Sequence, residues 1–253
     1  MLRDYFGLSE EVDGIELFPV CVTEWEEFNR VSSKFLQYNY EFLFYRTDAN
    51  EDAMLFDLIV AIVSNDILKT ESLKCDSVKD IELLFSKVTK RNAKYKTLDN
   101  GKTWVVELDN GKVIDRDNYD AIRDVLLRQN IIYEPLIVED ELSQKIIDDG
   151  IRAMSKRGSK RELESMISYI CNMSGVSSDE IQKYSYYRLQ CDIEMWQRIE
   201  FNRAIHGYRS QGAKIQTINE FKEFEVHKNP YSWDALFTKH DANKEAEMQR
   251  MLS

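Results

Sequence analysis

Apolar residues recur every three or four positions along most of this chain, the spacing that gathers them on one face of an α-helix. In one such segment, Ile81, Leu84 and Phe85 fall on the same side. The same pattern predicts helices over residues 52–64, 78–88, 119–130, 139–156, 161–173 and 186–208. These segments predict a mostly helical protein.

A further helix is expected behind Thr23. Thr23 and Glu26 have the spacing of a capping box, in which each side chain binds the backbone amide of the other residue. An aromatic stripe that begins at Trp25 and Phe28 follows. Between residues 38 and 44 the aromatic residues are too crowded for their spacing to separate helix from strand.

The clearest β signal lies in one region. Residues 93–98, 103–108 and 113–114 are short runs rich in aromatic and β-branched side chains. Each of the two intervals contains an Asn-Gly dipeptide, which favours a type I′ turn with positive φ at both central residues. The sequence therefore predicts a small three-stranded antiparallel meander near 93–114, and the helix predicted behind it is expected to cover its apolar face.

The predicted fold class is α+β, predominantly α-helical. With 9 Gly and 3 Pro in 253 residues, the chain has few of the turn formers that a sandwich or propeller needs. An extended stretch at 131–138 is interrupted by Pro135, and the residue before a proline is biased away from helix. We place a domain boundary there, between a mixed α+β domain at 1–134 that contains the meander and a helical domain at 135–253 with an aromatic tail.

The chain is acidic, with 45 acidic and 34 basic side chains and a formal net charge of −11. This charge repels phosphate backbones, so no nucleic-acid partner is expected. The predicted helices on either side of residues 174–176, with the short turn between them, resemble a helix-turn-helix motif. The second of them opens on Ser-Ser-Asp-Glu at 177–180, which places carboxylates where a recognition helix approaches DNA. A helical hairpin used for packing or partner binding is favoured instead.

The cysteines predict a reducing compartment. Cys21, Cys75, Cys171 and Cys191 lie far apart and form no CxxC pair, which indicates free thiols. The first residues carry acids where a signal peptide needs an apolar core. The longest apolar run, at 54–63, contains an aspartate and is too short to span a bilayer, so no membrane association is expected.

No catalytic residue, metal ligand or cofactor is predicted, and we expect the protein not to be an enzyme. The histidines, His206, His227 and His240, have no second His or Cys at the spacing of a metal site. The chain contains no nucleophile elbow, phosphate-binding loop or dinucleotide fingerprint. Acidic pairs stand at expected helix starts or on exposed faces, where charge is usually solvated.

The candidate binding element is the aromatic segment after Pro230. Its Tyr231, Trp233 and Phe237 are of the residue types that anchor protein contacts. The sequence leaves open whether these side chains pack back on the chain's own domain or insert into the groove of a partner.

Two stretches resemble proteins encoded among the tail genes of phages that infect low-GC Gram-positive bacteria. The first runs from VIDRDNYDAIR at 113–123 to QNIIYEP at 129–135, and is similar to a strand that enters an I-x-R-x-N-[FY]-x-x-I-R helix and leaves through QN-x-I-[FY]-E-P. The second lies in the C-terminal half and includes residues 167–175, 184–189 and the KNPY of 228–231. The shared motifs are structural, and none of them is catalytic.

This resemblance implies a non-enzymatic late phage protein, a tail assembly chaperone or a closely associated tail protein, in the cytoplasm of the infected bacterial host. Such a chaperone coats the long tape-measure protein and hands it to the polymerising tail-tube protein. These two proteins are therefore the expected partners, and self-association is left open. The alternative is a structural component of the tail or baseplate that stays in the virion.

Overall fold

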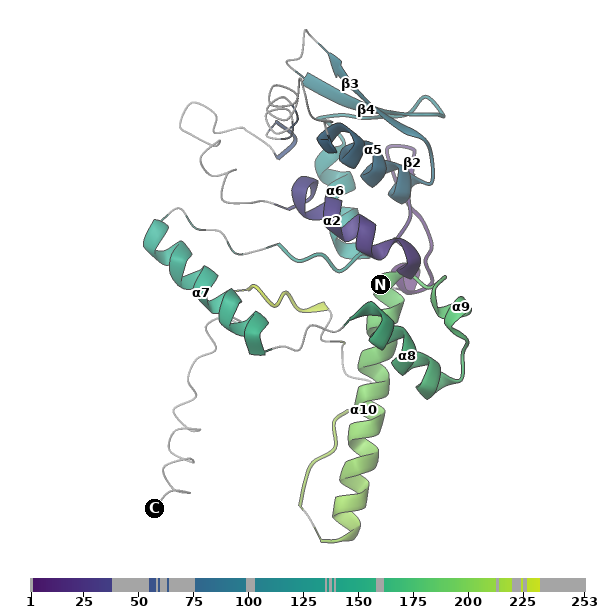
Figure 1. Cartoon of the computed structure of the whole chain (residues 1–253), viewed down its shortest axis with the longest axis vertical. Helices are drawn as coiled ribbons and strands as arrows, with labels where there is room; N and C mark the ends of the chain where they lie inside the picture. Colours follow the sequence, from purple (N-terminus) through teal and green to yellow (C-terminus); the bar gives the residue numbers. More distant parts are fainter. Residues whose placement is uncertain are drawn as a thin grey trace. The chain divides into compact units, whose positions relative to one another are not determined.

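A computed structural model describes residues 2–37, 55–57, 59, 63, 76–98, 103–134, 136, 138, 140–157, 162–212, 214–219, 224 and 227–232. The fold is α+β and mainly helical, as the sequence predicts (Figure 1). The chain divides into two compact units. The first contains Met1–Ile132 and Arg161–Lys228, and the second contains Tyr133–Lys160 and Asn229–Ser253.

The strands β3 (Ala93–Leu98), β4 (Thr103–Leu108) and β5 (Val113–Ile114) form the predicted antiparallel meander, in that order across the sheet. Every second residue of β4 is buried. Two helices cover this face. Helix α5 (Asp76–Thr89) packs against β3, and α6 (Tyr119–Gln129) brings the Tyr119 ring edge-on to Trp104. The expectation that one following helix covers the sheet is therefore incomplete.

The turn between β4 and β5 differs from the predicted type I′ turn. Gly111 has a φ of 79°, but Asn110 is not at positive φ. The Gly111 amide donates to the Leu108 carbonyl at 2.9 Å, and the Leu108 amide donates to the Lys112 carbonyl at 2.8 Å. Three residues therefore form the loop, with the glycine in the left-handed position of a bulged turn. The turn between β3 and β4, at 99–102, lies outside the described residues.

The N-terminal segment contains a second sheet, which the patterning of residues 1–22 does not predict. Strands β1 (Glu10–Val12) and β2 (Ile15–Leu17) form an antiparallel hairpin. Asp13 and Gly14 have φ angles of 50° and 77°, so the Asp-Gly pair makes a turn with positive φ at both central residues. This hairpin contacts α5 and α6 and buries the two apolar side chains of β2.

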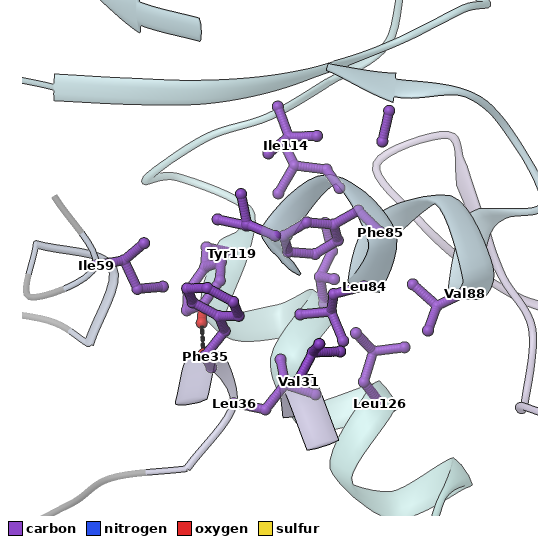
Figure 2. Close-up of a cluster of buried hydrophobic side chains, with 14 of the residues drawn as sticks. Val31, Phe35, Leu36, Ile59, Leu84, Phe85, Val88, Ile114, Tyr119 and Leu126 are labelled. Atoms are coloured by element: carbon purple, nitrogen blue, oxygen red, sulfur yellow. Dashed lines mark hydrogen bonds between the residues drawn. The ribbon is translucent and has the colours of Figure 1, made fainter. Parts of the chain in front are cut away.

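The main core lies between α2 (Trp25–Phe35), α5, α6 and the meander (Figure 2). Its apolar side chains are buried, and the Tyr119 hydroxyl donates to the Phe35 carbonyl within the cluster. The predicted helix over 52–64 is described at only a few positions, but those that are buried join the same core: Leu55, Phe56, Ile59 and Val63. The aromatic residues between 38 and 44 lie outside the described part of the chain.

Thr23 does not cap α2, so the predicted capping box is wrong. A 3-10 turn, η1 (Val22–Glu24), leads into the helix, and Glu24 occupies the N-cap position without a side-chain hydrogen bond to the backbone. The Val22 amide donates to the Tyr184 carbonyl at 2.9 Å. A backbone contact with a distant segment therefore sets how the chain enters α2.

A second buried cluster joins α8 (Leu163–Ser174), α9 (Ser178–Ile181) and α10 (Tyr186–Ser210). Gly175 ends α8 at a φ of 73°, and the Ser177 side chain accepts from the Glu180 amide, as the sequence predicts for this stop and restart. The fully packed members are Val22, Met166, Ile170, Ile181, Leu189 and Ile193.

These helices belong to the first unit rather than to a separate C-terminal domain. Val22, from the N-terminal segment, lies in the same apolar cluster as α8 and α10, and this contact ties residues 161–228 to the α+β part. The boundary expected after residue 134 thus divides α6 from α7 (Glu141–Arg157), but the chain returns to the first unit at Arg161.

Candidate protein-binding surface

The first turn of α10 is fixed to the N-terminal part of the chain. The Ser185 hydroxyl caps the helix by accepting from the Arg188 amide at 3.1 Å. The Tyr186 amide donates to the Val20 carbonyl at 3.0 Å, and the Tyr186 ring stacks on Trp25 with 3.5 Å between centroids. These contacts fix the direction in which α10 begins. We call this first turn, residues 185–188, the root of α10.

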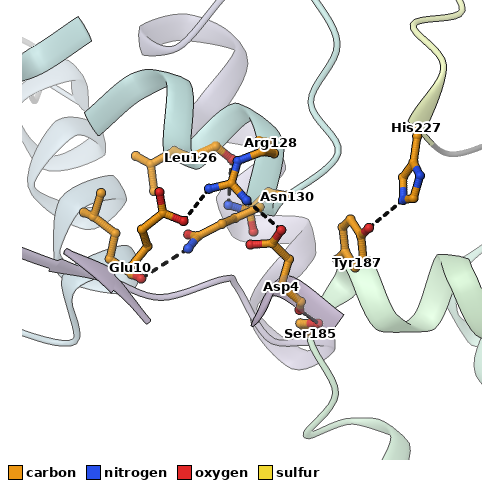
Figure 3. A network of polar contacts seen from close by, with 10 residues as sticks. Asp4, Glu10, Leu126, Arg128, Asn130, Ser185, Tyr187 and His227 are labelled. Atoms are coloured by element: carbon orange, nitrogen blue, oxygen red, sulfur yellow. Dashed lines mark hydrogen bonds and ion pairs between the residues drawn. The ribbon is translucent and has the colours of Figure 1, made fainter. Parts of the chain in front are cut away.

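A polar network beside the root joins α1 (Leu2–Tyr5), β1 and α6 (Figure 3). The Asp4 side chain is fully buried, and its Oδ2 accepts from Arg128 Nη1 at 2.6 Å. Arg128 also pairs with Glu10, and the Asp4 carbonyl accepts from the Ser185 hydroxyl at 3.0 Å. A buried carboxylate needs a cationic partner. The network therefore links the end of α6 to the beginning of α10 through Asp4.

Burial keeps the titratable thiol and phenol groups beside the root in their neutral, unreactive forms. Burial, together with the nearby Asp192 carboxylate, raises the pKa of the Cys191 thiol to about 12. Burial and the Asp192 contact also raise the pKa of Tyr5 to about 12, while its hydroxyl donates to Asp192 Oδ1 at 2.7 Å. A raised pKa lowers the thiolate population, so this cluster packs the helix and does not activate a nucleophile.

After α10 ends at Ser210, the chain reverses and its described residues run back along the helix. Arg209 Nε donates to the Ile215 carbonyl at 2.6 Å. Asn202 holds the backbone of Ile218 at both groups, with its Nδ2 at 2.8 Å from the carbonyl and its Oδ1 at 2.9 Å from the amide. We call the returning residues, described at 214–219, 224 and 227, the strap.

The strap stays with α10 as far as the root. The Arg198 guanidinium lies 5.2 Å from the centre of the Phe224 ring, in a cation–π contact. At the root, the Tyr187 hydroxyl and His227 Nε2 are 2.5 Å apart, and the two rings stack (Figure 3). Successive strap residues thus meet earlier and earlier positions of the helix, as an antiparallel return requires.

The far half of α10 and the beginning of the strap carry exposed apolar side chains. Phe201 and Tyr208 are seven residues apart, hence on the same side of the helix, and are 47% and 57% exposed. Ile215 and Ile218 are exposed too, beside the positions that Arg209 and Asn202 hold. We call the surface formed by Phe201, Tyr208, Ile215 and Ile218 the α10 arm. This end of α10 extends well past α8 (Figure 1).

The stretch of chain that carries the α10 arm is basic. Residues 201–219 contain Arg203, Arg209 and Lys214 and no carboxylate, although the whole chain has a net charge of −11. Exposed aromatic rings with cationic neighbours are the composition of protein contact surfaces. The helical periodicity of 186–208 predicts the buried stripe at Leu189 and Ile193, but it does not predict this basic stretch. A count of charge along the chain would have found this acid-free stretch.

Of the three predicted binding residues, the structure describes only Tyr231. Tyr231 lies in the second unit and is half-buried, in a turn where its amide donates to Asn229 Oδ1 at 2.8 Å. Asn229 Nδ2 in turn donates to the Glu134 carbonyl at 3.3 Å. Trp233 and Phe237 lie outside the described residues. Their role as a protein-binding segment stays a prediction.

Among the described residues, no group of three or more His, Cys, Asp or Glu side chains is placed to hold a metal ion. In the same part of the chain, no helix combines the length and the apolar character needed to cross a membrane. No protein-family model, curated protein or solved structure matches this chain.

Proposed function

We propose that this chain is a non-enzymatic protein-binding module of phage tail morphogenesis, acting in the cytoplasm of the infected host. In that role it is a chaperone that holds the tape-measure protein and promotes assembly of the tail-tube protein around it. The phage assignment comes from the sequence resemblance at 113–135 and 228–231.

The observation that carries the protein-binding part of the proposal is the α10 arm. Phe201 and Tyr208 are about half exposed on a helix whose root is tightly fixed by Ser185 and Trp25. A rigid mount lowers the conformational entropy lost when a partner binds. Large aromatic side chains held out in this way favour protein contact over a role in the chain's own core.

The charge distribution suits a chaperone. An unassembled tape-measure chain exposes apolar stripes, and the α10 arm offers apolar side chains that would cover part of such a stripe. The remainder of the chain is acidic, since the whole chain has a net charge of −11, and it would keep the complex dispersed. Each contact is small, so many copies would bind together strongly and still leave one at a time.

Co-expression with the tape-measure protein of the same phage tests the proposal. We expect the two proteins to co-purify, and we expect the tape-measure protein to become more soluble than when it is expressed alone. Failure to co-purify, with unchanged solubility of the tape-measure protein, would falsify the chaperone function. Mass spectrometry of purified particles then separates a chaperone, which is absent from mature virions, from a structural tail component, which is present.

A further inference from the structure

Helix α7 carries a second exposed apolar face. Leu142 and Ile146 are one helical turn apart and are 69% and 53% exposed. The opposite side of the helix is the buried one. Ile147 is 1% exposed, and Gln144 accepts from the Val138 amide at 2.9 Å. Leu142 and Ile146 therefore take little part in packing α7 within its own unit.

The segment that carries this face is acidic. Between residues 139 and 149 the sequence contains five carboxylates and one cationic residue, Lys145. Asp149 follows Leu142 by seven residues and so lies on the same side of the helix as Leu142 and Ile146. We call Leu142, Ile146 and Asp149 the α7 face.

We propose that the α10 arm of one copy of this chain binds the α7 face of a second copy. Both surfaces are exposed and apolar, and the charged residues beside them have opposite signs. Arg209 and Lys214 adjoin the arm residues Tyr208 and Ile215 in a stretch, 201–219, that has no carboxylate, whereas the α7 face contains Asp149 and lies in a segment with five carboxylates. Opposite charges of this kind favour one pairing and disfavour contact of either surface with its own like.

The two surfaces also match in length along their helices. Phe201 and Tyr208 are separated by two helical turns, about 10 Å along α10. Leu142 and Asp149 are separated by the same number of residues on α7. An amphipathic helix docks through anchors at such i, i+4 and i+7 positions. The strap residues Ile215 and Ile218 widen the arm, so that a docked helix would contact apolar side chains from two segments.

The contact is small, and the resulting association is reversible. A few apolar anchors on each side place it among weak, transient interfaces, which form and dissociate at micromolar or higher protein concentration. A tape-measure segment would compete with the second copy for the α10 arm. The pairing of copies is nevertheless a separate claim from the proposed function, because it concerns the chain without any partner.

Sedimentation velocity over a range of protein concentrations tests the pairing. We expect the wild-type chain to have an average mass that rises with concentration above the monomer mass of 29.9 kDa. Added salt should reduce this rise because it screens the opposite charges. A wild-type chain that stays monomeric at every concentration would overturn the proposal.

Two charge-reversed variants identify the surfaces. One carries Lys214→Glu on the arm, and the other carries Asp149→Lys on α7; both side chains are exposed. Each variant alone should self-associate less than the wild-type chain, because the reversed charge removes the attraction between the arm and α7. A mixture of the two should associate again, since the Lys214→Glu arm of one copy meets the Asp149→Lys face of the other. Self-association of either variant at the wild-type level, or no recovery in the mixture, contradicts the pairing.

Cross-linking of the wild-type chain gives a test that requires no variant. Lys214 in the arm and Lys145 in α7 are both exposed. In an equal mixture of unlabelled and 15N-labelled protein, we expect Lys214–Lys145 cross-links that join a light peptide to a heavy one. If these cross-links join only peptides of the same label, the contact lies within one copy and the proposal is wrong. Co-purification with the tape-measure protein would be unaffected by that result.

Discussion

At the scale of single residues, Trp104 connects parts of the core that are distant in the sequence. Its ring is fully buried, with its centroid 4.0 Å from that of Phe56 and 6.0 Å from that of Tyr119. Its indole Nε1 donates to the Phe56 carbonyl at 2.9 Å. One side chain of β4 therefore joins the meander, the start of α6 and the segment around Phe56.

We expect Trp104→Ala to lower the free energy of unfolding by about 3–5 kcal/mol, because it opens a large cavity in a packed core. Trp104→Phe keeps a ring in place but leaves the Phe56 carbonyl without its donor, which should cost about 1–3 kcal/mol. Chemical denaturation monitored by circular dichroism measures both. Thr97→Ala, an exposed change on the neighbouring strand β3, serves as the control and should alter stability by less than about 0.5 kcal/mol. Equal losses for Thr97→Ala and Trp104→Ala would contradict this description of the core.

Cys191 provides a prediction about pH. Burial raises its pKa to about 12 from an ordinary value of 9.0. Because the thiolate is the reactive form, at mildly alkaline pH Cys191 should carry about a thousandfold less of it than an unperturbed thiol does. Its rate of alkylation should be far below that of the half-buried Cys171, and should increase as the pH rises toward 12.

Alkylation of the native chain, followed by peptide mass spectrometry, checks this order. In denaturant the two thiols should react at similar rates, because the burial that separates them is gone. Native Cys191 that reacts as fast as Cys171 at mildly alkaline pH would contradict the buried environment assigned to the root of α10.

At the scale of elements, the strap depends on few contacts. Asn202 binds both the amide and the carbonyl of Ile218, and its replacement removes both hydrogen bonds at once. We expect Asn202→Ala to lower the free energy of opening of the strap by about 1–2 kcal/mol. Hydrogen exchange of the peptide that contains Ile218 should accelerate by about 5- to 30-fold, without loss of the main core.

His206→Ala is the matched control for this change, because His206 is exposed on the same helix and makes no contact with the strap in the described hydrogen bonds. Its exchange at Ile218 should equal that of the wild-type chain. If Asn202→Ala leaves exchange at Ile218 unchanged, the strap is held by something other than Asn202.

The helices and the meander were predictable because each has a long, regular pattern. Ile81, Leu84 and Phe85 are all buried, as their spacing indicates. Short elements escaped prediction for lack of such a pattern. The β1–β2 hairpin has three-residue strands, and its Asp13-Gly14 pair was the one signal that could have revealed it. At Thr23 a local capping rule failed because the backbone contact between Val22 and Tyr184, distant in sequence, fixes the chain there.

At the scale of the whole molecule, charge and apolar exposure are unevenly distributed. The net charge of −11 coexists with an acid-free stretch at 201–219, and this stretch also carries Phe201 and Tyr208 in solvent. Sequence patterning could not predict this surface, since it ranks aromatic residues by their periodicity and not by their exposure. The predicted aromatic segment has Tyr231 half-buried, and the α10 arm is the stronger candidate for protein contact.

The most direct test of the central claim is capture of the tape-measure protein by variants of the α10 arm. We expect Phe201→Ser with Tyr208→Ser to reduce co-purification at least about tenfold relative to the wild-type chain, because interface anchors of this type typically contribute more than 1 kcal/mol each. Leu98→Ser, which removes an exposed apolar side chain from β3, is the matched control and should retain wild-type capture. If the arm variant captures as much tape-measure protein as the wild-type chain does, the α10 arm is not the binding surface.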